Sequence, residues 1–171
     1  MDILVAEASI EQKPVLYRLM QLYLHDTSEF TGDDANVDGV FAYRYFDEYW
    51  REPDRFPFLI HSGGSLAGFV LVNSHTVLLD QRAGRSIAEF FVMRKYRRQG
   101  VGRRAAFYTF EGFPGQWEVR EHDKNLAGQS FWRSVIGEYT GGEYSEAILN
   151  DHSWVGPIQT FDNSRGNQVQ A

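Results

Sequence analysis

SIAEFFVMRKYRRQGVGRR, residues 86–104, is the stretch that decides the fold. Its first eight residues are almost all apolar, which predicts a central strand covered on both faces of a sheet. Two glycines follow within a basic segment, and apolar residues at helical spacing mark a helix after them. The order is therefore strand, glycine-rich turn, helix.

Such a turn can form an anion site. A helix leaves its first N–H groups unpaired, and its dipole makes that end partly positive. Gly100 and Gly102 allow a tight turn and a close approach of a phosphate or pyrophosphate, although a solvated basic turn fits the same residues. A Walker A loop would need lysine where Arg103 stands, and a dinucleotide fingerprint would need a third glycine.

Charge is unevenly distributed along the chain. The net charge of −6 argues against a general nucleic-acid binder. Residues 1–55 hold twelve acidic and five basic residues, whereas residues 82–104 hold eight basic residues and one acid, Glu89. A basic patch in an acidic protein favours a specific anionic ligand. The absence of cysteine excludes disulfides and thiolate chemistry.

The length of 171 residues predicts one domain, over 1–161, with a flexible polar tail over 162–171. Apolar periodicity predicts strands and helices in alternation. Strands are expected at 3–6, within 56–74 as a hairpin turned at Gly63-Gly64, and at 86–93, 116–121, 143–149 and 153–161. Helices are expected from Ser9 to about 25, over 41–50 with Pro53 and Pro57 after it, over about 106–113, and from 127 to a stop at Gly137. The fold class is α/β (α+β mixed sheet), with about six to seven strands and about four helices on both faces.

The glycine-rich turn resembles the acyl-CoA-binding signature of the GNAT N-acetyltransferase superfamily. The pattern Arg/Gln-x-x-Gly-x-Gly/Ala is matched by Arg97, Gly100 and Gly102. A family-like valine, Val92, lies eight residues before Gly100, and Arg94 stands where many members carry proline.

A second block supports the resemblance. Asn125, Gly128, Phe131 and Trp132 are similar to the family's Asn-x-x-Ala-x-x-Phe-Tyr, with glycine for alanine and tryptophan for tyrosine. The two blocks are separated by a helix and a strand, as the family requires. The resemblance covers residues 1–161 and implies the GNAT fold.

The resemblance implies acetyl-CoA as the cosubstrate, lying between the fourth and fifth strands with its pyrophosphate on the glycine-loop amides. The residues implied for the donor are Val92, Met93 and Arg94 along the pantetheine arm, Arg97, Arg98, Gln99, Gly100, Val101, Gly102 and Arg103 in the loop, and Asn125, Phe131 and Trp132 on the last helix. The reaction implied is direct attack of a primary amine, on a small molecule or peptide, on the thioester.

Catalysis needs a group that takes a proton from the ammonium. Glu89 is the candidate base, because a carboxylate in an apolar strand has a raised pKa if it is buried; a structural pairing with a nearby arginine is the alternative. The family's acid is the tyrosine of the last helix, and the indole of Trp132 cannot supply a proton. Tyr108, Tyr139, Tyr144 or solvent would have to substitute.

The acceptor side is expected in the first two helices and their connection, where Asp26 and Glu29 are candidate substrate-binding residues for a cationic amine. The histidine spacings predict no metal site. The sequence further predicts a cytoplasmic protein with no nucleic-acid or membrane partner, and the resemblance is compatible with a homodimer. Two alternatives stay open: a non-catalytic acyl-CoA-binding module of the same fold, and a nucleotide- or phosphate-binding protein.

Overall fold

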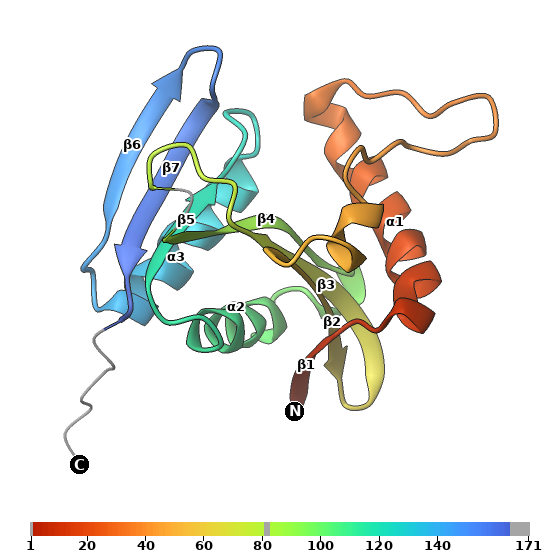
Figure 1. The fold of residues 1–171 in the computed structure, drawn as a ribbon, viewed down its shortest axis with the longest axis horizontal. Helices are drawn as coiled ribbons and strands as arrows, with labels where there is room; N and C mark the ends of the chain where they lie inside the picture. Colours follow the sequence, from red (N-terminus) through yellow and green to blue (C-terminus); the bar gives the residue numbers. More distant parts are fainter. Residues whose placement is uncertain (1, 81–82, 165–171) are drawn as a thin grey trace.

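Seven strands form one mixed sheet in the order β1-β2-β3-β4-β5-β7-β6, in which only β4 and β5 are parallel neighbours (Figure 1). The computed structural model describes residues 2–80 and 83–164. The strands are β1 (Ile3–Glu7), β2 (Arg55–Ser62), β3 (Ser65–Asn73), β4 (Gly84–Val92), β5 (Gln116–Arg120), β6 (Ser145–Asn150) and β7 (Val155–Asp162). Within the described residues the α-helices are α1 (Lys13–Thr31), α2 (Val101–Glu111) and α3 (Leu126–Thr140).

The sheet separates two apolar cores. On one face, Leu16, Met20 and Leu24 of α1 pack against Phe69 and Phe91. On the other face lie α2 and α3, whose apolar side chains surround the buried ring of Trp117. Figure 1 shows α1 on the opposite side of the sheet from α2. The central strands are therefore covered on both faces, as the apolar run 86–93 predicted.

The prediction of a helix over 41–50 is wrong, and the described chain therefore has three α-helices where about four were predicted. Only a single 3₁₀ turn, η2 (Asp47–Trp50), forms there. The side chain of Gln21 on α1 holds the backbone of Phe41 at both ends, with Nε2 to the carbonyl at 3.0 Å and Oε1 to the N–H at 2.8 Å. The backbone groups that a helix would need are thus engaged by α1.

Several predicted boundaries differ from the structure. α1 continues past residue 25 to Thr31, where Gly32 at φ 77° ends it. α3 passes Gly137 and ends at Thr140, before Gly141 at φ 64°. Pro57 does not close a helix but lies in β2, beyond the last residue pair with β1, where a missing N–H is tolerated.

β4 contains a bulge beside the proposed base. Leu71 of β3 faces Glu89, but the next residue, Val72, faces Ile87, so Ala88 is an extra residue in the strand. Simple alternation would place Ile87 and Glu89 on the same face. The bulge instead leaves Ile87 in the α2/α3 core and turns Glu89 toward α1.

β7 ends at Asp162, and Asn163 is still bonded to Gly115, with N to O at 3.0 Å and Gly115 N to Oδ1 at 2.8 Å. The remainder of the predicted flexible tail, 165–171, lies outside the described residues. Among the helices of the described chain, none has the length and apolar character needed to cross a membrane.

Candidate active site

The sheet opens between its two parallel strands. Pairing of β4 with β5 runs from Gly84 opposite Gln116 to Ile87 opposite Val119 and ends there. β5 stays attached to β7 as far as Arg120, whereas β4 continues along β3 to Val92. The N–H of Met93 bonds to Ala67 of β3 at 2.8 Å, so the carbonyl of Val92, in the same peptide group, points to the opposite side, toward the opening.

The glycine-rich loop lies at the end of β4. After the 3₁₀ turn η3 (Arg94–Tyr96), Arg98 has φ 58° and Gly100 has φ 78°, and α2 begins at Val101. In the part of the chain that the structure describes, the amides of residues 98–103 have no hydrogen-bond acceptor, and the first bond of α2 is from Arg104 to Gly100 at 3.1 Å. A row of free amides at a helix start is an arrangement that suits a phosphate oxygen.

Gly102 is required for packing as well. A Cβ atom added there would lie 3.1 Å from the ring of Phe131 and 3.6 Å from the ring of Phe90. The start of α2 therefore lies directly against the ring that α3 supplies. This contact joins the two sequence blocks that the family resemblance identified.

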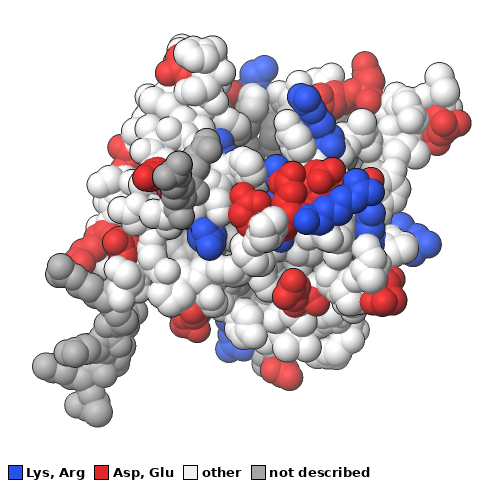
Figure 2. All heavy atoms as spheres, in the orientation of Figure 1, with Lys and Arg blue, Asp and Glu red and all other residues white. Residues whose placement is uncertain are grey.

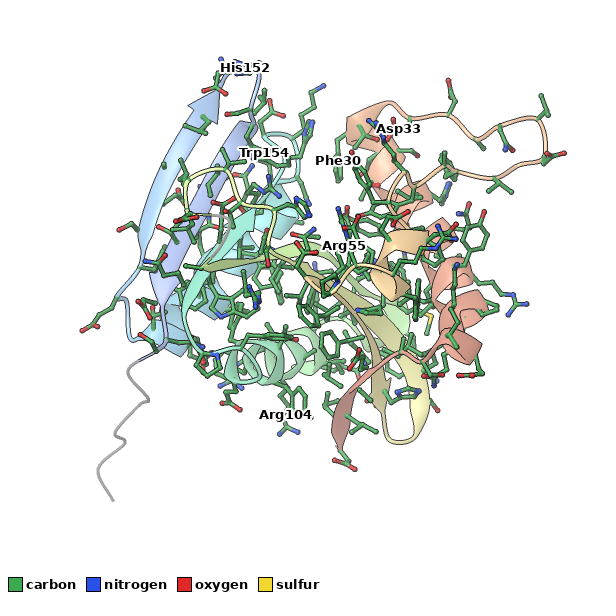
Figure 3. All side chains as sticks on the ribbon, viewed as in Figure 1. Phe30, Asp33, Arg55, Arg104, His152 and Trp154 are labelled. Carbon is green, nitrogen blue, oxygen red and sulfur yellow. The ribbon has the colours of Figure 1, made fainter. Side chains whose placement is uncertain are left out.

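Side chains of the basic segment are largely engaged by acids. Arg94 and Arg97 both bond to Asp26 of α1, each at 2.8 Å, and Arg103 pairs with Glu138 of α3. Arg104 points away below α2 (Figure 3). These acids offset the charge of three of the arginines that the sequence placed here.

Of the second block, Phe131 and Trp132 pack against Phe90 of β4, whereas Asn125 caps α3. The side chain of Asn125 is the N-cap of α3 and accepts from the N–H of Gly128 at 2.9 Å. A Cβ atom at Gly128 would lie 2.5 Å from Asn125 Nδ2, so an alanine there would require the Asn125 side chain to move. Trp132 is buried, with its ring 4.9 Å from that of Phe90 and 4.9 Å from that of Phe131.

Glu89 lies on the α1 face, held by tyrosine. The hydroxyl of Tyr23 donates a hydrogen bond to Oε2, and the hydroxyl of Tyr43 also bonds to the carboxylate. Burial raises the pKa of Glu89, while the two hydroxyls and the charge of Arg120 oppose that rise. The alternative that Glu89 pairs directly with an arginine is not what the structure shows, because its bonded partners are these two tyrosines.

The tyrosines around Glu89 belong to a longer network that sequence reasoning missed. Tyr49 of η2 accepts from Asn73 Nδ2 at 3.2 Å and is bonded to Tyr43. Arg55, buried at the start of β2, lies over the ring of Tyr49 at 5.5 Å. Tyr43 and Tyr49 lie in the segment 41–50, for which the sequence predicted a helix, so their place beside Glu89 was not foreseen.

The residues predicted to protonate the leaving thiolate lie in different surroundings. Tyr139 is at the far end of α3 from Asn125, and its hydroxyl accepts from Asn163 Nδ2 at 3.1 Å. Tyr108 is half-exposed on α2. Neither is brought to Glu89 or to the opening between β4 and β5 by any contact of the described residues.

The two residues predicted to bind the acceptor, Asp26 and Glu29, lie in different surroundings. The carboxylate of Asp26 is bonded to two arginines, whereas Glu29, one turn further along α1, is exposed. Aromatic and basic side chains also lie beyond the end of β5. The ring of Phe30 contacts that of His122 at 5.6 Å, and Arg120 lies 5.2 Å from the ring of Trp154. Figure 3 shows Phe30 and Trp154 approaching from opposite sides.

The surface also carries charged clusters and a hollow that do not include the predicted site residues. Figure 2 shows acidic and basic side chains close together near the centre of this face. Arg55 and Glu52 form an ion pair at 2.5 Å. Glu52, Asp54 and His75 are close enough to share a cation, but the first is bonded to Arg55. A shallow hollow of about 460 Å³ lies elsewhere, at the start of β5 beside Tyr144 and Thr160.

Comparison with known proteins agrees with this geometry. Residues 16–133 match the Acetyltransferase (GNAT) family. No curated protein matches the sequence. Solved structures with the same fold include the ribosomal-protein-S18-alanine N-acetyltransferase from Escherichia coli, with 15% identity, 99% of each chain covered and a TM-score of 0.62.

Two further structures have similar values. An acetyltransferase from Thermus thermophilus has 13% identity and a TM-score of 0.67, covering 95% of this chain and 97% of that one. The PaiA N-acetyltransferase from Thermoplasma acidophilum, in complex with coenzyme A, has 14% identity and a TM-score of 0.57, covering 95% and 99%. These identities establish a shared fold, and the family match over more than half of the sequence establishes that the chain belongs to the GNAT acetyltransferase family.

Proposed function

We propose that the protein is an N-acetyltransferase that transfers the acetyl group of acetyl-CoA to a primary amine of a small molecule or peptide. The observation that carries this proposal is the opening between β4 and β5, with free amides at its mouth and Glu89 on the α1 face. The amine nitrogen attacks the thioester carbonyl, an N–C bond forms, the C–S bond breaks, and the amine loses a proton.

In this proposal the donor is bound mainly by main-chain groups. The amides of residues 98–103 bind the pyrophosphate, and the side of β4 that faces the opening pairs with the pantetheine arm as an added strand would, beside the Val92 carbonyl, which accepts from Arg97. Phe131 and Trp132 form the apolar wall on the α3 side. The loop fits such a group because its amides are free and Gly100 already has the positive φ that the turn needs.

Glu89 is the proposed base, and its surroundings fit that role. Burial raises its pKa toward the range in which a carboxylate accepts a proton efficiently, and the tyrosine hydroxyls hold one carboxylate geometry. No dedicated acid is included. Since a thiol has a pKa near 8.5, a thiolate is a leaving group stable enough to depart and be protonated by water.

Two measurements test the proposal. Calorimetry should show binding of CoA in clear preference to ATP and NAD, and a thiol-release assay over a panel of primary amines should show amine-dependent release from acetyl-CoA. Preference for ATP or NAD would support the nucleotide-binding alternative. Tight CoA binding with no release for any amine would support the non-catalytic module.

The role of Glu89 has its own test. Glu89→Gln should lower turnover at neutral pH while leaving the affinity for acetyl-CoA nearly unchanged, because the amide oxygen can still accept the hydrogen bond of Tyr23 but the amide cannot take a proton. Turnover that is unchanged between pH 6 and pH 9 would remove Glu89 from the mechanism and leave the donor site unaffected.

A further inference from the structure

Asp26 connects α1 to the donor loop through two arginines. Its Oδ1 accepts from Arg94 and its Oδ2 from Arg97, each at 2.8 Å. Although burial opposes it, these bonds lower the pKa of Asp26, so the carboxylate is charged at neutral pH. The side chain of Asp26 is only about one-fifth exposed, whereas that of Arg94 is largely exposed, so the more protected contact is with Arg97.

Arg97 continues the connection to β4. Its Nε donates to the carbonyl of Val92 at 2.7 Å, and its guanidinium lies 5.7 Å from the ring of Phe91. The carbonyl of Val92 is on the side of β4 that faces the opening. One planar guanidinium therefore joins α1, the last residue of β4 and the start of the glycine-rich loop, which a flexible ammonium could not do in the same geometry.

The same turn of α1 also holds the proposed base. Tyr23 precedes Asp26 by three residues, so the two side chains lie on one face of the helix. Tyr23 bonds to Glu89 and Asp26 bonds to Arg97. The position of the base and the position of the donor loop are thus both set by residues 23–26.

We infer that Asp26 and Arg97 are positioning residues for CoA, which set the donor loop and the end of β4 relative to α1 rather than contacting the acceptor or the phosphates. This inference rests on the proposed function. It assigns Asp26 to the donor side of the site, although the sequence had suggested the acceptor side.

Positioning and bulk charge predict opposite changes in CoA affinity when the charge of Asp26 is removed. Asp26 is a negative charge next to a proposed anion site, so its removal would release two arginines and strengthen CoA binding. Loss of the connection would instead loosen the loop, and binding would weaken. The sign of the change in affinity therefore separates positioning from bulk charge.

The experiment is calorimetry of CoA binding to folded wild type and Asp26→Asn at 25 °C. We expect the variant to bind about tenfold more weakly, the effect of losing a charge-assisted hydrogen bond. Glu138→Gln is the matched control, because it removes the acid paired with another loop arginine, Arg103, without touching Arg97. Its affinity should be unchanged or slightly higher.

A second variant tests the role of Arg97. Arg97→Lys keeps the charge but cannot bridge Asp26 and Val92, and it should also bind CoA several-fold more weakly. Asp26→Asn added to Arg97→Lys should cause little further loss, since both act through one connection. Equal or tighter CoA binding by Asp26→Asn, or full additivity of the two changes, would overturn the inference. A wild type that does not bind CoA would refute the proposed function itself.

Discussion

The hydroxyl of Tyr23 on α1 donates a hydrogen bond to the carboxylate of Glu89 on β4, across 66 residues of sequence. The bond favours the charged form of the carboxylate, while burial favours the neutral form. The pH at which Glu89 becomes a base is therefore the balance of these two effects, and single substitutions should move it in a known direction.

Tyr23→Phe should raise the pKa of Glu89, because it removes a hydrogen bond that lowers it. A base must be deprotonated to act, so the acidic limb of kcat/KM against pH should move to higher pH, and activity below the limb should fall. Tyr17→Phe on the same helix, whose ring packs on Phe46, is the control and should leave the limb in place. An unmoved limb in Tyr23→Phe would contradict the assignment.

Arg120→Gln tests the electrostatic contribution separately. The charge of Arg120 lowers the pKa of Glu89, so its removal should also shift the acidic limb to higher pH. Screening by salt should reduce the difference between wild type and Arg120→Gln, whereas it should not reduce the effect of Tyr23→Phe. The pH profiles at low and high ionic strength provide the comparison.

Glu121 predicts a pH dependence of stability. It is buried at the end of β5, neither carboxylate oxygen has a hydrogen-bond donor among the described residues, and burial raises its pKa from 4.5 to about 8. The folded state then holds a proton that the unfolded state releases above pH 4.5. Protonation of Glu121 therefore makes its whole contribution to the free energy of unfolding below pH 4.5, and this contribution is lost as the pH rises toward 8.

Denaturant unfolding at pH 5 and pH 8 measures this contribution. Each pKa unit corresponds to about 1.4 kcal/mol, so wild type should lose on the order of a few kcal/mol across the interval from this group. Glu121→Gln should flatten the dependence and be the more stable protein at pH 8. Parallel curves for the two proteins would show that Glu121 is not protonated in the folded state.

Two glycines of α3 should respond differently to alanine. Gly137→Ala should raise the free energy of unfolding by about 0.5–1 kcal/mol, because its added Cβ meets only Tyr144 at 3.7 Å. Gly128→Ala should lack this gain, because the Cβ displaces Asn125 and breaks the N-cap, which costs about 1 kcal/mol. Denaturant titration of both variants checks the contrast, which a similar gain at Gly128 would contradict.

The sequence predicted the family well because its signals are local. Gly100 and Gly102 between an apolar strand and a helix, with Asn125 and Phe131 further on, sufficed for the family, and the structure brings Gly102 and Phe131 into contact. The position of Glu89 in a strand was also readable. The side of the sheet that Glu89 faces could not be predicted, because it depends on the extra residue Ala88, and an apolar run of sequence does not indicate a bulge.

The contacts of the residues that the sequence suggested for the acceptor could not be predicted because they are long-range. Asp26 looked free in an acidic segment, but its partners Arg94 and Arg97 are about seventy residues away. The sequence predicts a helix over 41–50, and the contact of Gln21 with Phe41 that prevents this helix joins residues twenty positions apart, which periodicity does not reveal. Periodicity reports which residues are buried, not which polar partner they meet.

The opening between β4 and β5 also has a consequence for local unfolding of the sheet. Among the described residues, four residue pairs, from Gly84 and Gln116 to Ile87 and Val119, join the β1–β4 half of the sheet to the β5–β7–β6 half. The two halves should therefore exchange amide protons as separate cooperative units, with the seam opening at a lower free energy than either half. A ligand that fills the gap supplies the missing strand, so its largest effect on hydrogen exchange should appear along the seam, in residues that never touch it.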